Sequence, residues 1–369
     1  MIFRYAPFRI ILFRSLFAWG LIAASSLPAA QPTDAPTSPT SSATVQPSGA
    51  ITSGPLSIPF SPYASAEALA QFVRDANRSP APGLSGPIEA NRRYYDAINS
   101  DRVERMKKLY PVEIKSEKIA GVGTDIVTPA GGVSAANRGR VLINLHGGAF
   151  LWGAHSGALV ESIPVASVGK LKVISVDYRQ GPEATFPAAS EDVAAVYEAL
   201  LMHYKPQNIG IYGCSAGGIL TAQSVVWIAA HGLPRPGAVG TYCASLVETW
   251  GDSAFMGPVL SGNGPVTKPL LLVNLPYFKG ADPHDPLVFP GVSATALAHF
   301  PPTLLISGSR DFALSSVLRS HALLVQAGVD AELHVYEGMW HSFFSDPELP
   351  ESHAAYDVMV RFFDRHLGR

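Results

Sequence analysis

From residue 111 onward, short apolar runs alternate with longer segments whose apolar residues recur at helical spacing. Two runs joined by the turn Ala120-Gly121 alternate apolar and polar positions, which predicts a β-hairpin. The later runs are continuously apolar, as is typical of strands covered on both faces. This pattern predicts an α/β fold, with a mostly parallel eight-stranded sheet covered by helices on both faces. The expected strands are residues 112–119, 122–128, 141–145, 171–176, 209–212, 238–243, 303–307 and 331–336, and the expected helices are residues 157–170, 188–204, 216–231, 315–327 and 352–367.

The beginning of the chain has a different composition. Residues 1–30 contain three arginines, then an uncharged apolar run and small residues, which resembles a secretory signal peptide. An uncleaved N-terminal anchor that retains the protein at the membrane is the alternative, because Pro28 interrupts the small-residue pattern that ends at Ala30. Residues 31–60 consist mainly of Pro, Ser, Thr and Ala with one charge, so we expect a disordered or semi-extended linker.

The segment of residues 61–110 carries two helical patterns, at residues 66–77 and 88–109, separated by a stretch rich in Pro. We expect a helical cap or N-terminal extension here. Simple packing on the main body is one interpretation, and a lid above a substrate pocket is the other. The catalytic domain is then expected at residues 111–369.

The overall composition is that of a globular protein, with 47% apolar and 15% charged residues and a formal net charge of -2. This charge gives no reason to expect a nucleic-acid partner. The two cysteines, Cys214 and Cys243, define no disulfide framework, and each is expected to be a small buried apolar residue. Residues 282–285 have metal-ligand side-chain types, but a structured turn is the better interpretation. No metal and no cofactor are predicted.

The sequence Gly-Cys-Ser-Ala-Gly at residues 213–217 lies between an expected strand and an expected helix. A Gly-x-Ser-x-Gly pattern in this context predicts a sharp turn that exposes the hydroxyl of Ser215 above the sheet. A side chain at Gly213 or Gly217 would clash with the opposing arm of the turn. The pattern alone often marks an ordinary turn, but both flanking elements are present, so we expect Ser215 to be a nucleophile.

Ligands of such sheets bind beyond the carboxyl ends of the strands, so the partners of Ser215 are expected in the loops there. Asp311 follows the strand at residues 303–307, and His341 follows the strand at residues 331–336. A base must remove the hydroxyl proton and a third group must orient that base. The chain order Ser215, Asp311, His341 is that of the α/β-hydrolase triad.

A second turn directly follows the strand at residues 141–145 and has the sequence His-Gly-Gly-Ala-Phe. Its glycines free backbone N–H groups to turn inward. We expect the N–H groups of Gly147 and Gly148, with that of Ala216 at the start of the following helix, to stabilise an oxyanion.

These motifs resemble the hormone-sensitive-lipase-like group of α/β-hydrolase esterases, and the resemblance runs from about Arg140 to the C-terminus. That group has a His-Gly-Gly-Gly signature and a Gly-Asp-Ser-Ala-Gly-Gly elbow. Here Ala149 replaces the third glycine of the signature and Cys214 replaces the aspartate of the elbow. Residues 176–183 and 186–192 also resemble the group's stretch between these two motifs.

The resemblance implies an α/β-hydrolase fold with an N-terminal helical cap and no metal. It implies the same roles that the spacing suggests, with Ser215 as nucleophile, Asp311 as orienting group and His341 as base. It also implies Gly147 and Gly148 as oxyanion donors. The departures at Ala149 and Cys214 remove no catalytic group.

The segment of residues 245–298 lies between two strands and is rich in Gly, Pro and aromatic residues. We expect this insertion to form part of the cap and of the substrate pocket. The expected substrate-binding side chains are Trp250, Tyr277 and Phe278 from the insertion and Phe150 from the glycine turn. Ordinary packing is the alternative for each of them.

The sequence therefore predicts a secreted or periplasmic serine carboxylesterase. The resemblance implies small-molecule short-acyl esters as substrates, such as acetyl esters, lactones or carbohydrate esters, and the triad implies cleavage through an acyl-enzyme. One alternative is an amidase or peptidase that uses the same triad. Another is a non-catalytic binding protein of the same fold, against which the intact Ser215, Asp311 and His341 argue.

Overall fold

The computed structural model describes residues 44–52, 54, 57–84 and 86–368 of the chain. The predicted signal peptide at residues 1–30 and the larger part of the predicted linker at residues 31–60 lie outside this range. The chain divides into two units, residues 1–57 and 58–369. Among the described residues, no helix combines the length and the hydropathy needed to cross a bilayer.

In the first unit, strands β1 (Thr44–Val45) and β2 (Ile51–Thr52) form a small antiparallel pair. Gly49 in the connecting turn has a φ of 81°, which glycine adopts without steric cost. Its N–H donates to the carbonyl of Gln46 at 2.8 Å. Residues 44–52 of the expected disordered or semi-extended linker thus form a short hairpin, because a Ser-Gly turn allows the chain to fold back on itself.

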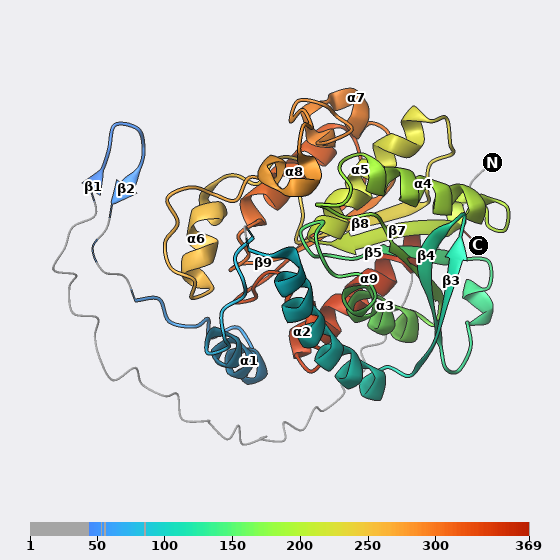
Figure 1. Ribbon diagram of the computed structural model, residues 1–369, viewed down its shortest axis with the longest axis horizontal. Coiled ribbons are helices and arrows are strands. Elements are labelled where there is room, and N and C mark those ends of the chain that lie inside the picture. The colour runs from blue at the N-terminus through green and yellow to red at the C-terminus, as the bar shows by residue number, and fades with distance from the viewer. Residues whose placement is uncertain (1–43, 53, 55–56, 85, 369) are drawn as a thin grey trace, which may run out of the picture. The chain divides into compact units, whose positions relative to one another are not determined.

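The second unit contains one eight-stranded sheet (Figure 1). Its strands are β3 (Val112–Ile119), β4 (Val122–Pro129), β5 (Val141–Leu145), β6 (Lys172–Asp177), β7 (Ile209–Cys214), β8 (Ala238–Tyr242), β9 (Thr303–Gly308) and β10 (Ala331–Tyr336). They lie in the order β10-β9-β8-β7-β5-β6-β4-β3. The β3–β4 and β4–β6 pairs are antiparallel and the other pairs are parallel.

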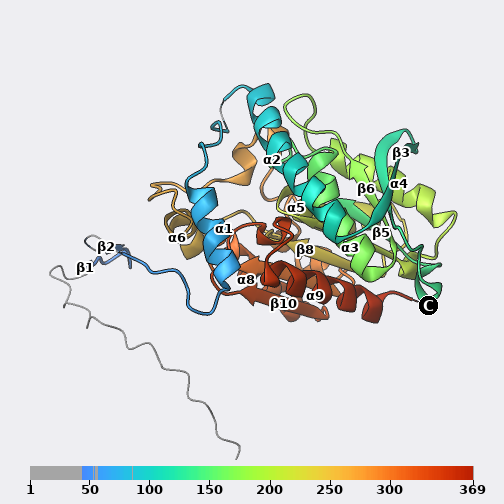
Figure 2. The same ribbon diagram turned by 90° about the horizontal axis from the view of Figure 1, so that it is seen from below.

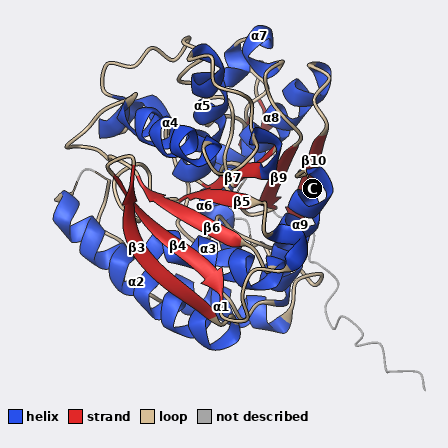
Figure 3. Ribbon diagram, turned by 90° about the vertical axis from the view of Figure 1, so that its right-hand side faces the viewer, coloured by secondary structure: helices blue, strands red, loops and turns tan. Residues whose placement is uncertain are grey.

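Helices cover both faces of this sheet (Figure 3). They are α1 (Ala66–Ala76), α2 (Ile88–Leu109), α3 (Ser156–Gly169), α4 (Ala188–Leu201), α5 (Ala216–Ala230), α6 (Asp252–Leu260), α7 (Ala294–Leu297), α8 (Leu314–Gln326) and α9 (Pro350–His366). The cores on the two faces are separate: α4, α5 and α8 contribute to one, and α1, α2, α3 and α9 to the other. Helix α2 packs along α3 on the outer side (Figure 2). The predicted α/β fold with a mostly parallel eight-stranded sheet is confirmed.

The strand order locates the crevice where a ligand would bind. The chain passes from β5 to β6 on one side and then crosses to β7 on the other side of β5. The carboxyl ends of β5 and β7 therefore flank a point at which the direction of winding reverses, which is where open α/β sheets bind ligands. The His-Gly-Gly-Ala-Phe loop and Ser215 follow these two strand ends directly.

The buried strands should dominate stability. Leu142 in β5 is completely buried in the core beneath α3 and α9. Replacing it in a Leu142→Ala variant leaves a cavity, so we expect the free energy of unfolding to fall by about 3 kcal/mol. Leu318→Ala is the matched control, since Leu318 on α8 is 47% exposed. Urea unfolding measures both variants, and equal losses would contradict this assignment of the core.

Candidate active site

Ser215 lies on a sharp turn between β7 and α5. Its φ of 55° and ψ of -122° are strained for a residue with a side chain, at a cost of order 1–3 kcal/mol. The turn closes because Gly213 and Gly217 have no Cβ. A Cβ at these positions would lie 2.2 Å and 1.7 Å, respectively, from the carbonyl oxygen of Leu145. The N–H of Ser215 also donates to the carbonyl of Tyr242 at 2.8 Å. Contacts with β5, β7 and β8 therefore fix the position of Ser215.

The structure brings Ser215 together with His341 and Asp311. The Nε2 atom of His341 lies 2.9 Å from the Oγ of Ser215, and its Nδ1 lies 2.8 Å from Oδ1 of Asp311. Asp311 follows β9 and His341 follows β10, so both side chains come from the carboxyl edge of the sheet. When Nδ1 carries the proton, the imidazole donates to the carboxylate and accepts from the serine hydroxyl.

Asp311 is completely buried, and both of its carboxylate oxygens accept hydrogen bonds. The Ala313 N–H donates to Oδ1 at 2.9 Å and the Ser307 hydroxyl donates to Oδ2 at 2.9 Å. Burial alone would raise the pKa of Asp311. The charge of His341 and the hydrogen bonds from His341, Ala313 and Ser307 together outweigh burial and hold the pKa below its ordinary value. The carboxylate is therefore ionised beside the imidazole. Sequence reasoning did not identify Ser307, which has no distinguishing motif.

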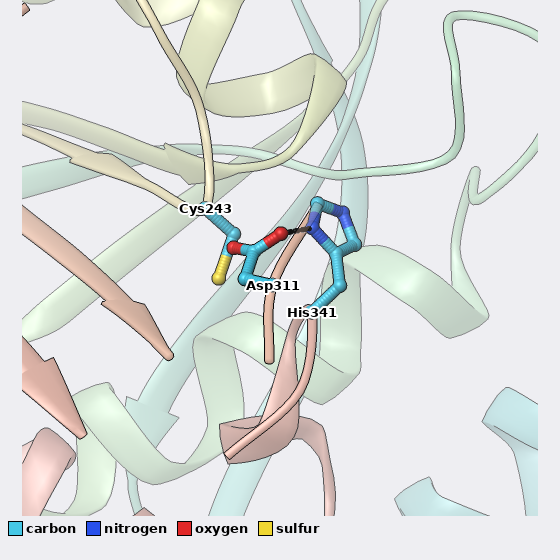
Figure 4. A group of neighbouring side chains, drawn as sticks. All are labelled: Cys243, Asp311 and His341. Carbon is cyan, nitrogen blue, oxygen red and sulfur yellow. Dashed lines mark hydrogen bonds and ion pairs between the residues drawn. The ribbon is translucent and has the colours of Figure 1, made fainter. Parts of the chain in front are cut away.

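Two buried thiols lie near this pair and contact Ser342, the residue that follows His341. Figure 4 shows Cys243 on the opposite side of the Asp311 carboxylate from His341. The atoms of these three side chains that could bind a metal ion lie within 4.8 Å of one another. The Ser342 N–H is 3.3 Å from the Cys243 sulfur, and the Ser342 hydroxyl is 2.9 Å from that of Cys214. Burial raises the pKa of both thiols, so neither is a thiolate at neutral pH. Both Asp311 oxygens already accept hydrogen bonds, which favours an orienting role over metal ligation.

The loop of residues 146–150 follows β5 and faces Ser215. Ala149 has a φ of 54°, in the left-handed region that favours glycine, at the position where the signature has its third glycine. The N–H groups of Gly148, Ala149 and Ala216 have no hydrogen-bond acceptor within the part of the chain that the structure describes. All three residues border the same cavity. They are thus free to bind a developing negative charge.

The N–H of Gly147 does not have the free orientation that the predicted role as an oxyanion donor requires. It donates to Oε1 of Glu161 at 2.7 Å. This N–H is therefore engaged, and it is not available to an oxyanion while that hydrogen bond lasts. The structure instead favours Gly148, Ala149 and Ala216 as the donors. The physical reason is a buried carboxyl group on α3 that the sequence analysis did not consider.

Glu161 is buried next to the glycine loop. Its Oε2 accepts hydrogen bonds from the side-chain amide of Asn144 at 3.0 Å and the N–H of Cys214 at 3.1 Å. Burial raises the pKa of Glu161 to about 8, although the hydrogen bonds from Gly147, Asn144 and Cys214 oppose the shift. The signal that could have identified it is its position as the one charged residue of helix α3.

His146 supports the same loop. Its Nδ1 lies 2.8 Å from the carbonyl oxygen of Gly147, and its ring stacks on Tyr178 with centroids 4.3 Å apart. The Tyr178 hydroxyl donates to the carbonyl of His146 at 2.7 Å. Burial lowers the pKa of His146 to about 4, so its imidazole is neutral at neutral pH. It can therefore donate to Gly147 without adding charge to the site.

Ser215, His341 and the glycine loop open onto a cavity of about 430 Å³. Helix α2 forms one wall, with Tyr95, Asn99 and Arg102 in the lining. Helix α2 therefore both packs along α3 and borders the cavity. The other lining side chains are mainly apolar and include Leu84, Phe150, Trp152, Val160, Ile219, Leu270, Leu272, Leu275 and Phe312.

Of the four aromatic residues expected to bind substrate, Phe150 borders the cavity and Trp250, Tyr277 and Phe278 do not. Trp250 is 58% exposed, whereas Tyr277 and Phe278 are buried in the core behind Phe150. Tyr277 stacks on Phe150 with ring centroids 4.6 Å apart, and its hydroxyl accepts from the N–H of Ala189 at 2.9 Å. These two residues support Phe150 rather than contact a ligand. The insertion instead contributes Thr249, Leu270, Leu272 and Leu275 to the lining.

Comparisons with known proteins agree with this geometry. Residues 142–345 match the α/β hydrolase fold family. The chain is 28% identical over 243 residues to an acetyl-hydrolase of Streptomyces hygroscopicus, covering 63% of this chain and 78% of the relative. Its structure is similar to that of esterase E25, with a TM-score of 0.72, 31% identity, and coverage of 85% of this chain and 98% of the other. An esterase of the bacterial hormone-sensitive lipase family gives a TM-score of 0.71 and 25% identity, with coverage of 83% of this chain and 100% of the other.

The chain belongs to the α/β-hydrolase fold family. Within that family it is a member of the hormone-sensitive-lipase-like group of esterases, as the sequence resemblance implied. It is a hydrolase of the esterase class.

Glu161 should make stability depend on pH. Its pKa is about 8 in the folded protein, above its ordinary value of 4.5. Between these values the folded protein keeps a proton that the unfolded chain has lost. The contribution of this group to the free energy of unfolding is therefore fully present below about pH 4.5 and decreases as the pH rises toward about 8. The stability difference between wild type and Glu161→Gln, measured by urea unfolding, should fall across this window. A difference that does not change with pH would contradict the assignment.

Proposed function

We propose that this esterase is a serine carboxylic ester hydrolase that works through a covalent acyl-enzyme. The observation that supports it is the continuous hydrogen-bonded chain from Ser215 through His341 to Asp311, at the edge of a cavity. His341 removes the hydroxyl proton as the Ser215 oxygen attacks the ester carbonyl. Asp311 keeps the imidazole in the required tautomer and stabilises the imidazolium that forms.

The carbonyl oxygen becomes negatively charged as the new bond forms. The N–H groups of Gly148, Ala149 and Ala216 stabilise this oxyanion, and the N-terminal end of α5 adds a favourable dipole. The imidazolium of His341 then protonates the leaving alcohol. Water, activated by the same imidazole, attacks the acyl-enzyme and releases the acid.

Short-acyl esters are the proposed substrates, among them acetyl esters, lactones and carbohydrate esters. A cavity of about 430 Å³ is at the small end of the range of roughly 300–1,000 Å³ for ligand pockets. The acetyl-hydrolase named above is a relative that supports this choice. Asn99 and Arg102 line one wall. The Nε and Nη2 atoms of Arg102 already donate to Asp346, so the side-chain amide of Asn99 is the polar group that suits an alcohol portion carrying hydroxyl groups.

An organophosphonate tests the nucleophile. We expect wild-type protein to gain one adduct, mapped by mass spectrometry to Ser215, with complete loss of esterase activity. Ser215→Ala should gain no adduct and lose activity by at least about 1,000-fold. Ser224→Ala is the control, because the Ser224 hydroxyl donates to the carbonyl of Leu220 within α5 and does not border the cavity. An adduct on another residue, or an active Ser215→Ala variant, would refute the assignment.

A series of p-nitrophenyl esters tests the substrate class. Because the cavity is small, kcat/KM for the acetate and butyrate should exceed that for the palmitate by at least about 10-fold. The matched p-nitroanilides distinguish an esterase from an amidase or peptidase on the same triad. Faster turnover of the anilides, or a preference for the palmitate, would overturn this choice.

A further inference from the structure

The triad mechanism assigns no role to the carboxyl group of Glu161. The residue projects from α3 into the space between the carboxyl ends of β5 and β7 and is 9% exposed. Three N–H donors converge on it, two from the backbone and one from the side chain of Asn144. Burying a carboxyl group is costly unless it is hydrogen-bonded, and these three donors offset part of that cost.

The two oxygens of Glu161 contact the two segments that carry the oxyanion donors. Oε1 accepts from Gly147, which precedes Gly148 in the glycine loop. Oε2 accepts from Cys214, which lies two residues before Ala216. One carboxyl group thus joins the segment on one side of the proposed oxyanion to the segment on the other side.

The glycine loop needs such a restraint. Two consecutive glycines, Gly147 and Gly148, can adopt many backbone conformations, and the direction of each N–H follows the orientation of its peptide plane. Glu161 fixes the peptide between His146 and Gly147 through its N–H. His146 fixes the next peptide through the Gly147 carbonyl oxygen, 2.8 Å from Nδ1. That second peptide carries the N–H of Gly148.

The loop is also packed closely against the serine turn. A Cβ on Gly147 would lie 3.0 Å from the carbonyl oxygen of Cys214 and 3.4 Å from the Cβ of Ser215. Because the loop lies this close to Ser215, a small rotation of the loop would change the distance between the N–H of Gly148 and the carbonyl that Ser215 attacks. Donors of this kind act only when they are held at about 2.7–3.1 Å from the oxyanion.

We propose that Glu161 is a positioning residue for the oxyanion site, which holds the glycine loop and the Ser215 turn in register so that the N–H groups of Gly148 and Ala216 converge. The proposal rests on the serine-hydrolase function proposed above. A purely structural carboxyl group would affect folding stability alone. A positioning residue affects kcat more than KM, because its effect appears when the oxyanion forms.

Two variants test this role with p-nitrophenyl acetate as substrate. Glu161→Met replaces both carboxyl oxygens by a thioether, which is only a weak acceptor, while keeping the side-chain length, and we expect kcat to fall about 100-fold with KM within about 3-fold of wild type. Glu161→Gln keeps one carbonyl acceptor and should give an intermediate kcat. Asp125→Asn is the matched control: Asp125 is a buried carboxylate on β4 that accepts hydrogen bonds and does not border the cavity. Its kcat should remain that of wild type.

A trifluoromethyl ketone provides the second measurement, because its serine adduct carries an oxyanion. Its affinity should fall in parallel with kcat in Glu161→Met. Folded Glu161→Met with kcat within about 3-fold of wild type would overturn the proposal, as would a lower kcat with unchanged ketone affinity. If Glu161→Met does not fold, Glu161→Gln decides: a kcat reduced about 10-fold supports the proposal, and an unchanged kcat overturns it.

Organophosphonate labelling in the same experiment separates the two claims. Absence of an adduct on Ser215 of wild type overturns the serine-hydrolase function and this proposal with it. A normal adduct on wild type together with wild-type kcat in Glu161→Met overturns the role of Glu161 alone.

Discussion

The active site depends on how closely the backbone at the end of β5 approaches the turn that carries Ser215. Gly213 and Gly217 both pack against the carbonyl of Leu145, at distances that no Cβ would allow. This contact places the nucleophile beside the loop that follows β5, and Ser215, in the turn between these two glycines, has a positive φ of 55°. The serine and the oxyanion donors are therefore neighbours because the strand ends are neighbours, and the remaining residues are arranged around that contact.

Two buried carboxyl groups on either side of this contact have opposite electrostatic properties. Asp311 faces an imidazole and two further donors, which hold its pKa below the ordinary value. The hydrogen-bond partners of the Glu161 carboxyl group among the described residues are N–H groups, and burial raises its pKa to about 8. A permanent negative charge beside His341 stabilises the imidazolium, whereas one beside the oxyanion loop would oppose the reaction. The protein thus keeps the more acidic carboxyl group on the side of the base.

Sequence patterns predicted the fold well, because a sheet covered on both faces requires continuous apolar runs and its loops must meet at one edge. That reasoning also selected Ser215, Asp311 and His341, which the structure brings together. It did not identify Glu161 or the engagement of Gly147, because the contact between them joins α3 to a loop and depends on side-chain direction. It misplaced Tyr277 and Phe278 for a related reason: composition indicates burial but not whether a buried ring faces a cavity or the layer behind it.

The crystal structure of the phosphonylated enzyme would test the central claim most directly. We expect phosphorus on the Ser215 oxygen and a phosphonyl oxygen about 2.7–3.1 Å from the N–H groups of Gly148 and Ala216, with Gly147 still donating to Glu161. A phosphonyl oxygen bound to the Gly147 N–H, with Glu161 displaced, would contradict the proposed arrangement of donors. Phosphorus attached to any residue other than Ser215 would contradict the account as a whole.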